Sequence, residues 1–262
     1  MLEPFHDSAS ESEAASLAAA LQLDLDEAAG FISAGKPIPL ARSQTRSEAE
    51  MIAELVLRCG FKAAVIADEV LKPEQGLLRA RRLSLTEDKI ELSHSAGGIS
   101  LAKNDISVLV LGALKDTRMD YTEGISARRA GEVLDTSEFR SDEAVLDVYG
   151  TSLDESFRIK SDAFDYSGLV TPLSFRSREN FEAAVSRLRA ALPQAVFDDE
   201  YKSIQHLLGR AWPQRTRTET RGFKRTGLAF RSVAQASTLS DNRDQFERYS
   251  RLVFLISRKR SE

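Results

Sequence analysis

The sequence contains a single cysteine, Cys59, and only three histidines. One cysteine excludes an intramolecular disulfide and a multi-cysteine metal cluster, and it is typical of a reducing compartment. His6, His94 and His206 have no second histidine or cysteine at ligand spacing, which favours surface or packing roles over metal binding and acid–base catalysis. We therefore expect no metal, no cofactor, no catalytic residue and a cytoplasmic location.

Long apolar runs are also missing. No stretch approaches the about 18 apolar residues of a membrane-spanning helix, and the acidic N-terminus lacks the basic and apolar regions of a signal peptide. We expect no transmembrane span. Gly97 and Gly98 precede another strand-like segment instead of a helix, so they predict a hairpin turn and not a phosphate-binding loop.

Aromatic residues make up only 7% of the chain and charged residues 29%, but 42% hydrophobic residues suffice for a packed core. A length of 262 residues predicts two domains with connecting segments. We predict an α+β fold with four parts: a disordered head over residues 1–12, a small α/β module over 13–73, a mainly antiparallel β domain with a closing helix over 77–195, and a basic C-terminal extension over 196–262.

The net charge of −4 is distributed unevenly. Residues 1–36 hold seven acids and one lysine, a net charge of −6, whereas residues 202–262 hold fourteen lysines and arginines and five acids, a net charge of +9. The residues between them carry the remaining −7. We expect the basic end to contact acidic parts of its own chain or an anionic partner.

The segment Lys36–Leu71 has the pattern of a strand, a helix and a second strand. The strands are predicted at Ile38–Ala41 and Phe61–Ile66. Two strands joined through a helix normally lie parallel with a right-handed crossover. Upstream, leucines at helical spacing are interrupted near Asp24, which predicts one bent helix or two short ones between Ser16 and Ser33.

The helix inside this unit has chemical signals at both ends. Thr45 and Glu48 have the spacing of a capping box, which predicts a helix that begins near Ser47. Gly60 supplies the left-handed residue that ends it. An apolar stripe at helical spacing is predicted to pack on a sheet. The stripe consists of Ala49, Ile52, Leu55, Val56 and Cys59.

The order of these N-terminal elements resembles the C-terminal domain of the bacterial ribosomal stalk protein and the related ClpS adaptor fold. The residues that carry the resemblance are Leu23, Leu25, Glu27 and Ala28 in the first helical part, and Ser47, Glu48, Ala49, Glu50, Leu55, Gly60 and Val65 in the second. The resemblance implies a compact α/β binding module over about residues 17–67. The lysine-rich factor-binding face of the stalk domain is replaced here by Glu, Arg and Gln, so assignment to the ribosome is not implied.

The middle of the chain alternates between apolar and polar residues. The predicted strands are Arg81–Leu85, Lys89–Ser93, Ile99–Leu101, Ile106–Leu114, Ala144–Tyr149 and Ser156–Lys160. Ser177 begins an amphipathic helix that stops before Pro193. The phrases RRLSLTEDKIEL, ISLAKNDISVLVLG, VLDVYG and SFRIKSDAFDYSGL, followed by NFEAAVSRLRAAL, resemble the pleckstrin-homology-like barrel of bacterial proteins. The resemblance implies a barrel closed by a helix, with a curved open sheet as the alternative.

Residues 116–143 interrupt this domain with 28 residues rich in charge, Gly, Ser and Thr. A long segment without a strand or helix pattern inside a compact domain is typical of a flexible insertion. We predict a disordered excursion, with a partner-binding loop as the alternative.

The C-terminal part carries the candidate binding residues. Asp198–Trp212 is predicted to form a short helix, and the sequence RLVFLI near the end fits either a helix or a strand. Between them, cationic and aromatic residues alternate, a pattern that can hold phosphate and stack on bases or lie at an anionic membrane surface. A solvated tail is the alternative. The candidate residues are Arg215, Arg217, Arg221, Lys224, Arg225, Arg231, Trp212 and Phe223, with Phe230 nearby.

These patterns favour a non-catalytic bacterial adaptor or regulatory binding protein that acts through a protein partner. The first alternative is binding of nucleic acid or an anionic membrane surface through Arg210–Arg231. The second is an enzyme of unrecognised type, which would need a concave pocket with convergent polar groups.

Overall fold

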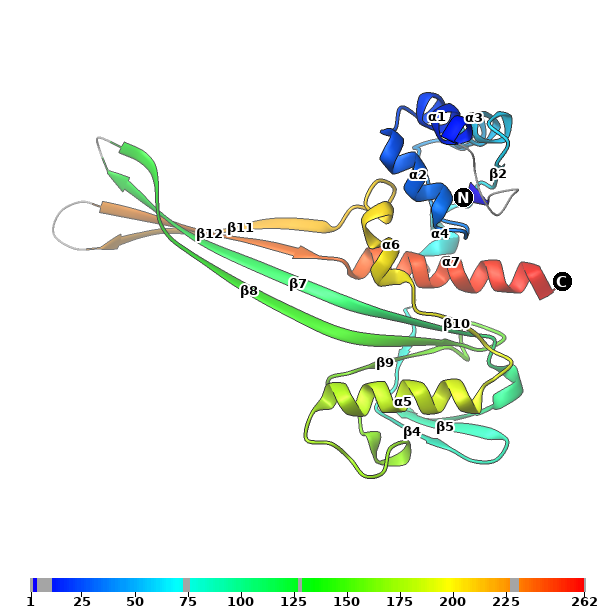
Figure 1. The fold of residues 1–262 in the computed structure, drawn as a ribbon. Coiled ribbons are helices and arrows are strands. Elements are labelled where there is room, and N and C mark those ends of the chain that lie inside the picture. Colours follow the sequence, from blue (N-terminus) through cyan, green and yellow to red (C-terminus); the bar gives the residue numbers. More distant parts are fainter. Residues whose placement is uncertain (1, 4–10, 73–75, 127–128, 227–230, 262) are drawn as a thin grey trace.

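A computed structural model describes residues 2–3, 11–72, 76–126, 129–226 and 231–261. The fold is α+β, and a long arm of paired strands projects from a body of helices and smaller sheets (Figure 1). The helices are α1 (Glu11–Leu21), α2 (Leu25–Ser33), α3 (Arg46–Arg58), α4 (Asp68–Leu71), α5 (Ser177–Ala191), α6 (Tyr201–Leu208) and α7 (Arg243–Ser261). The strands are β1 (Leu2–Glu3), β2 (Lys62–Ala63), β3 (Leu78–Arg79), β4 (Arg82–Leu85), β5 (Lys89–His94), β6 (Gly97–Ala102), β7 (Val108–Ser126), β8 (Arg129–Tyr149), β9 (Phe157–Lys160), β10 (Val196–Asp198), β11 (Arg215–Thr226) and β12 (Arg231–Asp241).

The signals at the ends of α3 are confirmed. The hydroxyl of Thr45 accepts a hydrogen bond from the backbone N–H of Glu48 at 3.3 Å, and the Glu48 carboxylate accepts one from the N–H of Thr45 at 3.3 Å. This is the predicted capping box. Gly60 ends the helix with a φ of 90°, a conformation that favours glycine. Upstream, the chain forms two short helices, α1 and α2.

The predicted parallel strand–helix–strand unit is wrong. The described segment Ile38–Ala41 contains one isolated bridge residue instead of a strand. The second strand is reduced to β2, which pairs antiparallel with β1. Ile38 and Leu40 are buried in a core built mainly by helices. Their apolar pattern therefore reflects packing against helices and not pairing with a parallel neighbour.

The largest sheet curls into a half barrel. Its strands follow the order β11-β12-β7-β8-β9-β3, and β10 pairs parallel with β7. The strands β11, β12, β7, β8 and β9 alternate in direction, whereas β3 runs parallel to β9. Because β7 and β8 are far longer than β9, β9 pairs with β8 only near the body, whereas β12 and β11 extend the sheet beside the outer part of β7.

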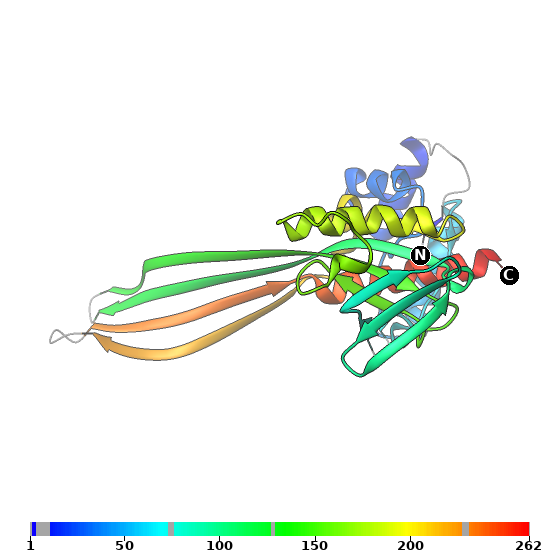
Figure 2. The same ribbon diagram turned by 90° about the horizontal axis from the view of Figure 1, so that it is seen from below.

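A second small sheet and a helix complete the middle of the chain. The predicted hairpins are confirmed as β4, β5 and β6, which pair antiparallel in that order. The predicted helix is confirmed as α5, which ends before Pro193. Side chains from α5, the small sheet and the inner parts of β7, β8 and β9 share one apolar core. Figure 2 shows α5 and the β4–β5–β6 sheet at the base of the arm.

The C-terminal part, residues 196–262, is not a separate extension, because its strands and helices belong to the body and the main sheet. Phe246, Tyr249 and Phe254 of α7 are almost fully buried and share a core with α1, α2 and α6. The strand alternative for RLVFLI is wrong, because these residues lie within α7. The basic segment before α7 forms β11 and β12, which join the sheet next to β7.

The predicted flexible insertion at residues 116–143 is replaced by paired strands. Residues 116–126 continue β7, residues 129–143 belong to β8, and the two run antiparallel in register. Residues 127 and 128 lie outside the described part. The charge-rich composition hid these strands because neither face of the hairpin is covered by a layer of the body (Figures 1 and 2).

A buried ion pair fastens α7 to the sheet. Arg158 donates hydrogen bonds to both carboxylate oxygens of Asp147, at 2.6 and 2.9 Å, and Ser250 of α7 donates to the same carboxylate at 2.6 Å. Burial alone would lower the pKa of Arg158, but Asp147 and Glu247 raise it above its ordinary value. The Arg158 cation is therefore kept inside the body, next to the base of the arm.

A second polar cluster joins α7 to the N-terminal part. The carboxylate of Asp198 accepts hydrogen bonds from Lys36 at 2.8 Å and from the hydroxyl of Tyr249 at 2.6 Å. Burial and the neighbouring carboxylate both raise the pKa of Tyr249.

Among the residues that the structure describes, none of the helices combines the length and apolar composition needed to cross a membrane.

Candidate interaction site on the projecting arm

The arm consists of two hairpins placed side by side. The first comprises residues 116–126 of β7 and 129–142 of β8, and the second comprises β11 and β12. β12 joins the hairpins by pairing antiparallel with β7. One row across all four strands contains Thr218, Thr238, Met119 and Glu138. The hairpins thus form one continuous antiparallel sheet, seen as a single layer in Figure 2.

Both long edges of the arm are open. Among the described strands, β11 pairs only with β12. On the other side, β9 covers β8 only from Val145 to Val148, so the outer part of β8 has β7 as its single strand neighbour in the described structure. An open edge presents backbone N–H and C=O groups to which another strand can pair.

The two hairpins carry opposite charges. The described residues of the first hairpin hold seven acids and three arginines, a net charge of −4. Those of the second hold six lysines and arginines and two acids, a net charge of +4. The edge strands follow the same trend: β11 has a net charge of +4, from five cationic residues and one acid, and residues 129–142 of β8 have −2, from four acids and two arginines.

Side chains near the base of the arm form ion pairs between residues two positions apart. Arg118 contacts Asp120 at 2.8 Å, and Ser237 of the neighbouring strand donates a hydrogen bond to the same carboxylate at 2.6 Å. Arg217 contacts Glu219 at 3.3 Å in the same way. Such pairs lie on one face of a strand, because side chains alternate between faces. They leave the backbone edge itself open.

The candidate residues of the basic segment do not form one compact patch. Arg215 lies at the base of β11, 3.8 Å from Asp244 of α7, and the side chain of Arg217 is 78% exposed. Arg221, Phe223, Lys224 and Arg225 follow along β11, and Arg231 begins β12. Strand pairing between β11 and β12 places these outer positions along the arm. Phe230 lies outside the described residues.

The burial of Trp212 contradicts the prediction that this residue is an exposed stacking platform. Its side chain is 5% exposed and belongs to the apolar core of the body. Its backbone carbonyl accepts a hydrogen bond from the buried side chain of Gln245 at 2.8 Å. Trp212 therefore anchors the segment before β11 and is not available to stack on a nucleic-acid base.

Sequence reasoning missed the acidic edge. Glu132, Asp135, Glu138 and Asp142 lie on β8, inside the segment that was predicted to be a flexible insertion. Among them, Glu138 pairs with Arg140 on the same strand through two hydrogen bonds, at 2.8 and 3.1 Å. The available signal was the charge of the segment, which is opposite to that of the C-terminal part.

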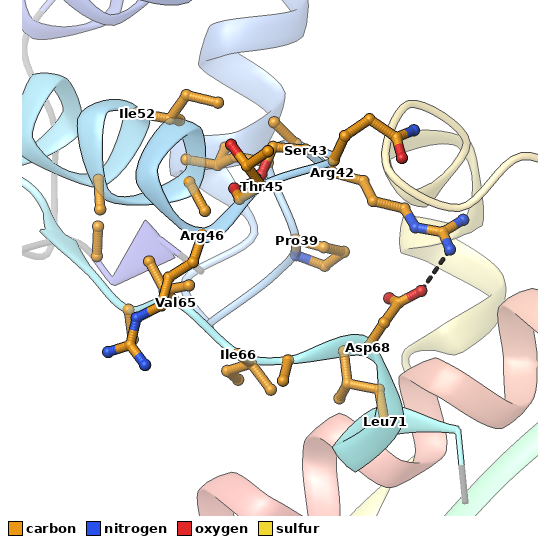
Figure 3. A pocket seen from close by; sticks show the side chains of 18 of the residues that line it. Pro39, Arg42, Ser43, Thr45, Arg46, Ile52, Val65, Ile66, Asp68 and Leu71 are labelled. Atoms are coloured by element: carbon orange, nitrogen blue, oxygen red, sulfur yellow. Dashed lines mark hydrogen bonds and ion pairs between the residues drawn. The ribbon is translucent and has the colours of Figure 1, made fainter. Parts of the chain in front are cut away.

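A pocket of about 590 Å³ lies beside α3 (Figure 3). Three residues of the apolar stripe that was predicted to pack on a sheet, Ala49, Ile52 and Val56, line this pocket instead, because no sheet forms between the segments on either side of α3. Residues 39–45 form one side, residues 63–69 form another, and Trp212 and Leu252 also line it. The pocket therefore offers apolar walls next to two extended stretches of backbone.

Three of the charged residues at this pocket, Arg42, Arg46 and Asp68, are paired within the chain. Arg42 and Asp68 form an ion pair, drawn as a dashed line in Figure 3. Arg46 contacts Glu50 at 2.7 Å. Asp68 also accepts a hydrogen bond from the buried side chain of Arg248 in α7. These contacts give Arg42, Arg46 and Asp68 structural partners next to the apolar walls of the pocket.

Ion pairs continue from the pocket to the base of the arm. Arg248 contacts both Asp68 and Asp244, and Asp244 is also paired with Lys72 and lies near Arg215. Burial tends to raise the pKa of Asp244, but the hydrogen bond from Lys72 and the surrounding cations outweigh it, so the pKa lies below its ordinary value. Arg215 at the start of β11 thus lies next to the ion pairs that link α7 to α4.

In the described part of the chain, no group of three or more His, Cys, Asp or Glu side chains is placed to hold a metal ion. His94 accepts a hydrogen bond from the backbone of Ala96 in a turn, and His206 lies in α6. His6 lies outside the described residues.

Comparisons of the chain with protein-family models, with curated proteins and with solved structures give no match.

Proposed function

We propose that the protein is a non-catalytic adaptor or regulatory binding protein that acts through protein–protein interaction at its arm. The observation that carries this proposal is a four-stranded arm, open along both edges, that projects from the body (Figure 1). Extended edge strands bind other chains by strand addition, in which backbone hydrogen bonds give affinity and side chains give specificity.

The composition of the arm supports a role in contacts with other molecules. No described residue in 116–142 or 215–241 belongs to either apolar core. Residues 136–142 of β8 and 215–218 of β11 are exposed. A projecting sheet that contributes nothing to the core is expected to be retained for what it binds.

The body supports the finer parts of the proposal. The packing of α5 with the β4–β5–β6 sheet and the inner parts of β7, β8 and β9 around one core supports a pleckstrin-homology-like domain over residues 77–195. The resemblance of the N-terminal module to the stalk and adaptor folds stays part of the proposal and rests on its sequence pattern. A bacterial, cytoplasmic setting belongs to the same proposal, and it rests on the cysteine content and on these resemblances.

Shortening the arm tests this function. We would delete residues 120–137 and 219–237 and join each pair of ends by an Asn-Gly turn, which suits a two-residue hairpin. Both cuts end at the row of Thr218, Thr238, Met119 and Glu138, so the remaining strands stay paired. The shortened and intact proteins would be used as baits in the same cell extract, and bound proteins compared by quantitative mass spectrometry.

We expect proteins bound specifically to the intact chain to be lost from the shortened one. A matched control is Arg42→Ala, which changes the pocket and leaves the arm intact. Binding that survives shortening but is lost in Arg42→Ala would place the function at the pocket and contradict the proposal.

A second candidate function is binding of nucleic acid or an anionic membrane surface along β11. The net charge of +4 on this edge strand favours it, because phosphate contacts need clustered cations. Purified protein would be titrated with single-stranded RNA, duplex DNA and phosphatidylserine vesicles at about 0.1 M and about 1 M salt, where the Debye length falls from about 10 Å to about 3 Å. Binding that disappears at high salt and in Arg217→Glu with Lys224→Glu supports this candidate. Failure to bind at low salt removes it.

A further inference from the structure

We infer that the arm binds a second copy of this chain, with β11 of one molecule paired to the outer part of β8 of its neighbour. The inference rests on the proposed function and names its partner. Both edge strands are open over most of their length in the described structure. They differ in charge, with +4 on β11 and −2 on residues 129–142 of β8.

Strand direction fits this pairing. β11 runs from the base of the arm toward its tip, and β8 runs from the tip toward the base (Figure 1). When two arms lie side by side and point the same way, β11 of one and β8 of the other are therefore antiparallel. Every strand pair within the arm is already antiparallel. The contact would extend the same sheet from one molecule into the next.

Charge selects this contact over the two alternatives. Pairing β11 with a second β11 would place two strands of +4 together, and pairing β8 with a second β8 would join two acidic strands. Like charges on neighbouring strands destabilise a sheet, whereas opposite charges stabilise it. Only the contact between unlike edges brings opposite charges together along the seam.

The edges are accessible where the contact needs them. In both views the arm projects beyond the helices of the body (Figures 1 and 2). The side chains of Thr136, Glu138 and Phe139 on β8 and of Arg217 on β11 are exposed. β9 blocks only the last part of β8, from Val145 to Val148, so the seam would begin outside this point.

Protection against aggregation is the simpler explanation for charged edge strands. Charge of one sign on both edges would protect equally against every neighbour. Here each edge repels its own kind and attracts the other. The distribution therefore leaves one contact open, which is heterologous and can close into a ring or continue as a fibre.

The test uses purified protein and two complementary variants. In variant A, Arg217, Arg221 and Lys224 are replaced by Glu, which changes β11 from +4 to −2. In variant B, Glu132 and Glu138 are replaced by Lys, which changes the outer part of β8 from −2 to +2. Sedimentation velocity over a concentration series measures the association of each protein alone and of an equimolar mixture.

We expect the wild type to associate, and A and B alone to associate at least about tenfold more weakly, because each then carries two edges of like charge. The mixture of A and B should regain association, since the edges of A complement those of B. Recovery in the mixture also shows that both variants are folded. A matched control replaces Arg176, which precedes α5, and Arg178 and Arg187 of α5 by Glu, the same change in net charge as in variant A at exposed positions, and should behave as the wild type.

The outcomes separate this inference from the proposed function. A wild type that stays monomeric at low salt overturns self-association but leaves binding to another protein, which the arm-shortened bait tests independently. Variants A and B that associate alone as strongly as the wild type would place the contact elsewhere on the molecule and also overturn the inference. Association that weakens in each variant and returns on mixing supports it.

Discussion

Buried hydroxyls are the clearest titratable groups of this protein. Tyr149, Tyr166, Tyr201 and Tyr249 are each no more than 5% exposed. Burial raises the pKa of all four above the ordinary tyrosine value of 10.0. In the native state these side chains therefore keep their protons at pH values where exposed tyrosines lose them.

This difference predicts destabilisation at alkaline pH. Above a pH of about 10 the unfolded tyrosines release protons that the native ones retain, so the free energy of unfolding falls as pH rises, by up to about 1.4 kcal/mol per pH unit for each tyrosine. Below that pH the full contribution is present. Urea unfolding measured across this range checks the slope. Tyr201→Phe should reduce it by the share of one tyrosine, and an unchanged slope would contradict the assignment.

At the scale of single residues, a contact between sequence neighbours was predictable from the sequence, whereas the burial of a side chain was not. The capping pair of Thr45 and Glu48 was recognisable because both partners lie within one turn of the chain. Trp212 was misjudged because its sequence neighbours are polar and cationic, whereas its neighbours in space come from the apolar core. The sequence shows which residues are neighbours along the chain, whereas burial depends on which residues are neighbours in space.

Among the elements, α7 joins the arm to the body. Its Phe246 packs against Gly112 of β7 so closely that a Cβ added at Gly112 would overlap the phenylalanine ring. Apolar packing and the buried pair of Asp147 and Arg158 therefore both hold this helix against the sheet.

Gly112→Ala should weaken the docking of α7. We expect a loss of about 1–3 kcal/mol in the free energy of unfolding, because the extra methyl group forces a buried ring out of place. Gly76→Ala is the matched control, since an added Cβ there has no atom within 4 Å. Equal unfolding midpoints in urea for the two variants would show that the ring moves aside at little cost.

Elements with local signals were predictable, and elements without a covered face were not. The hairpins β4, β5 and β6 and the helix α5 each have one apolar side, which gives the sequence a visible period. The strands of the arm are polar on both sides and lack that period. One signal was present, since Thr216, Thr218 and Thr220 alternate with charged residues along β11, and β-branched residues favour strands.

On the scale of the whole molecule, the arm is separate from the apolar cores that stabilise the protein. Both apolar cores lie in the body, and the described residues of the arm contribute to neither. The arm-shortened protein is therefore expected to unfold with a free energy within about 1 kcal/mol of the intact chain, in the range of changes at exposed sites. Circular dichroism during urea unfolding measures this. A loss of several kcal/mol would show that the arm supports the body.

The arrangement of the whole molecule could not be predicted from the sequence, for a related reason. The opposite charges of the middle and C-terminal segments were visible, and they suggested contact within the chain. That contact exists, because β12 pairs with β7. Its place and register depend on strand pairing between distant segments, which local periodicity does not encode.

The join between the two hairpins also sets an order of events during synthesis. Each hairpin is local, but Ile125 pairs with Ser232 and Asp116 with Asp241, separations of 107 and 125 residues. Pairings this distant along the chain form slowly. The first hairpin can fold as it leaves the ribosome, with one side of β7 waiting for a strand that has not yet been made. A growing chain therefore exposes an unpaired strand edge until β12 is translated, and this interval is when it most needs protection by chaperones.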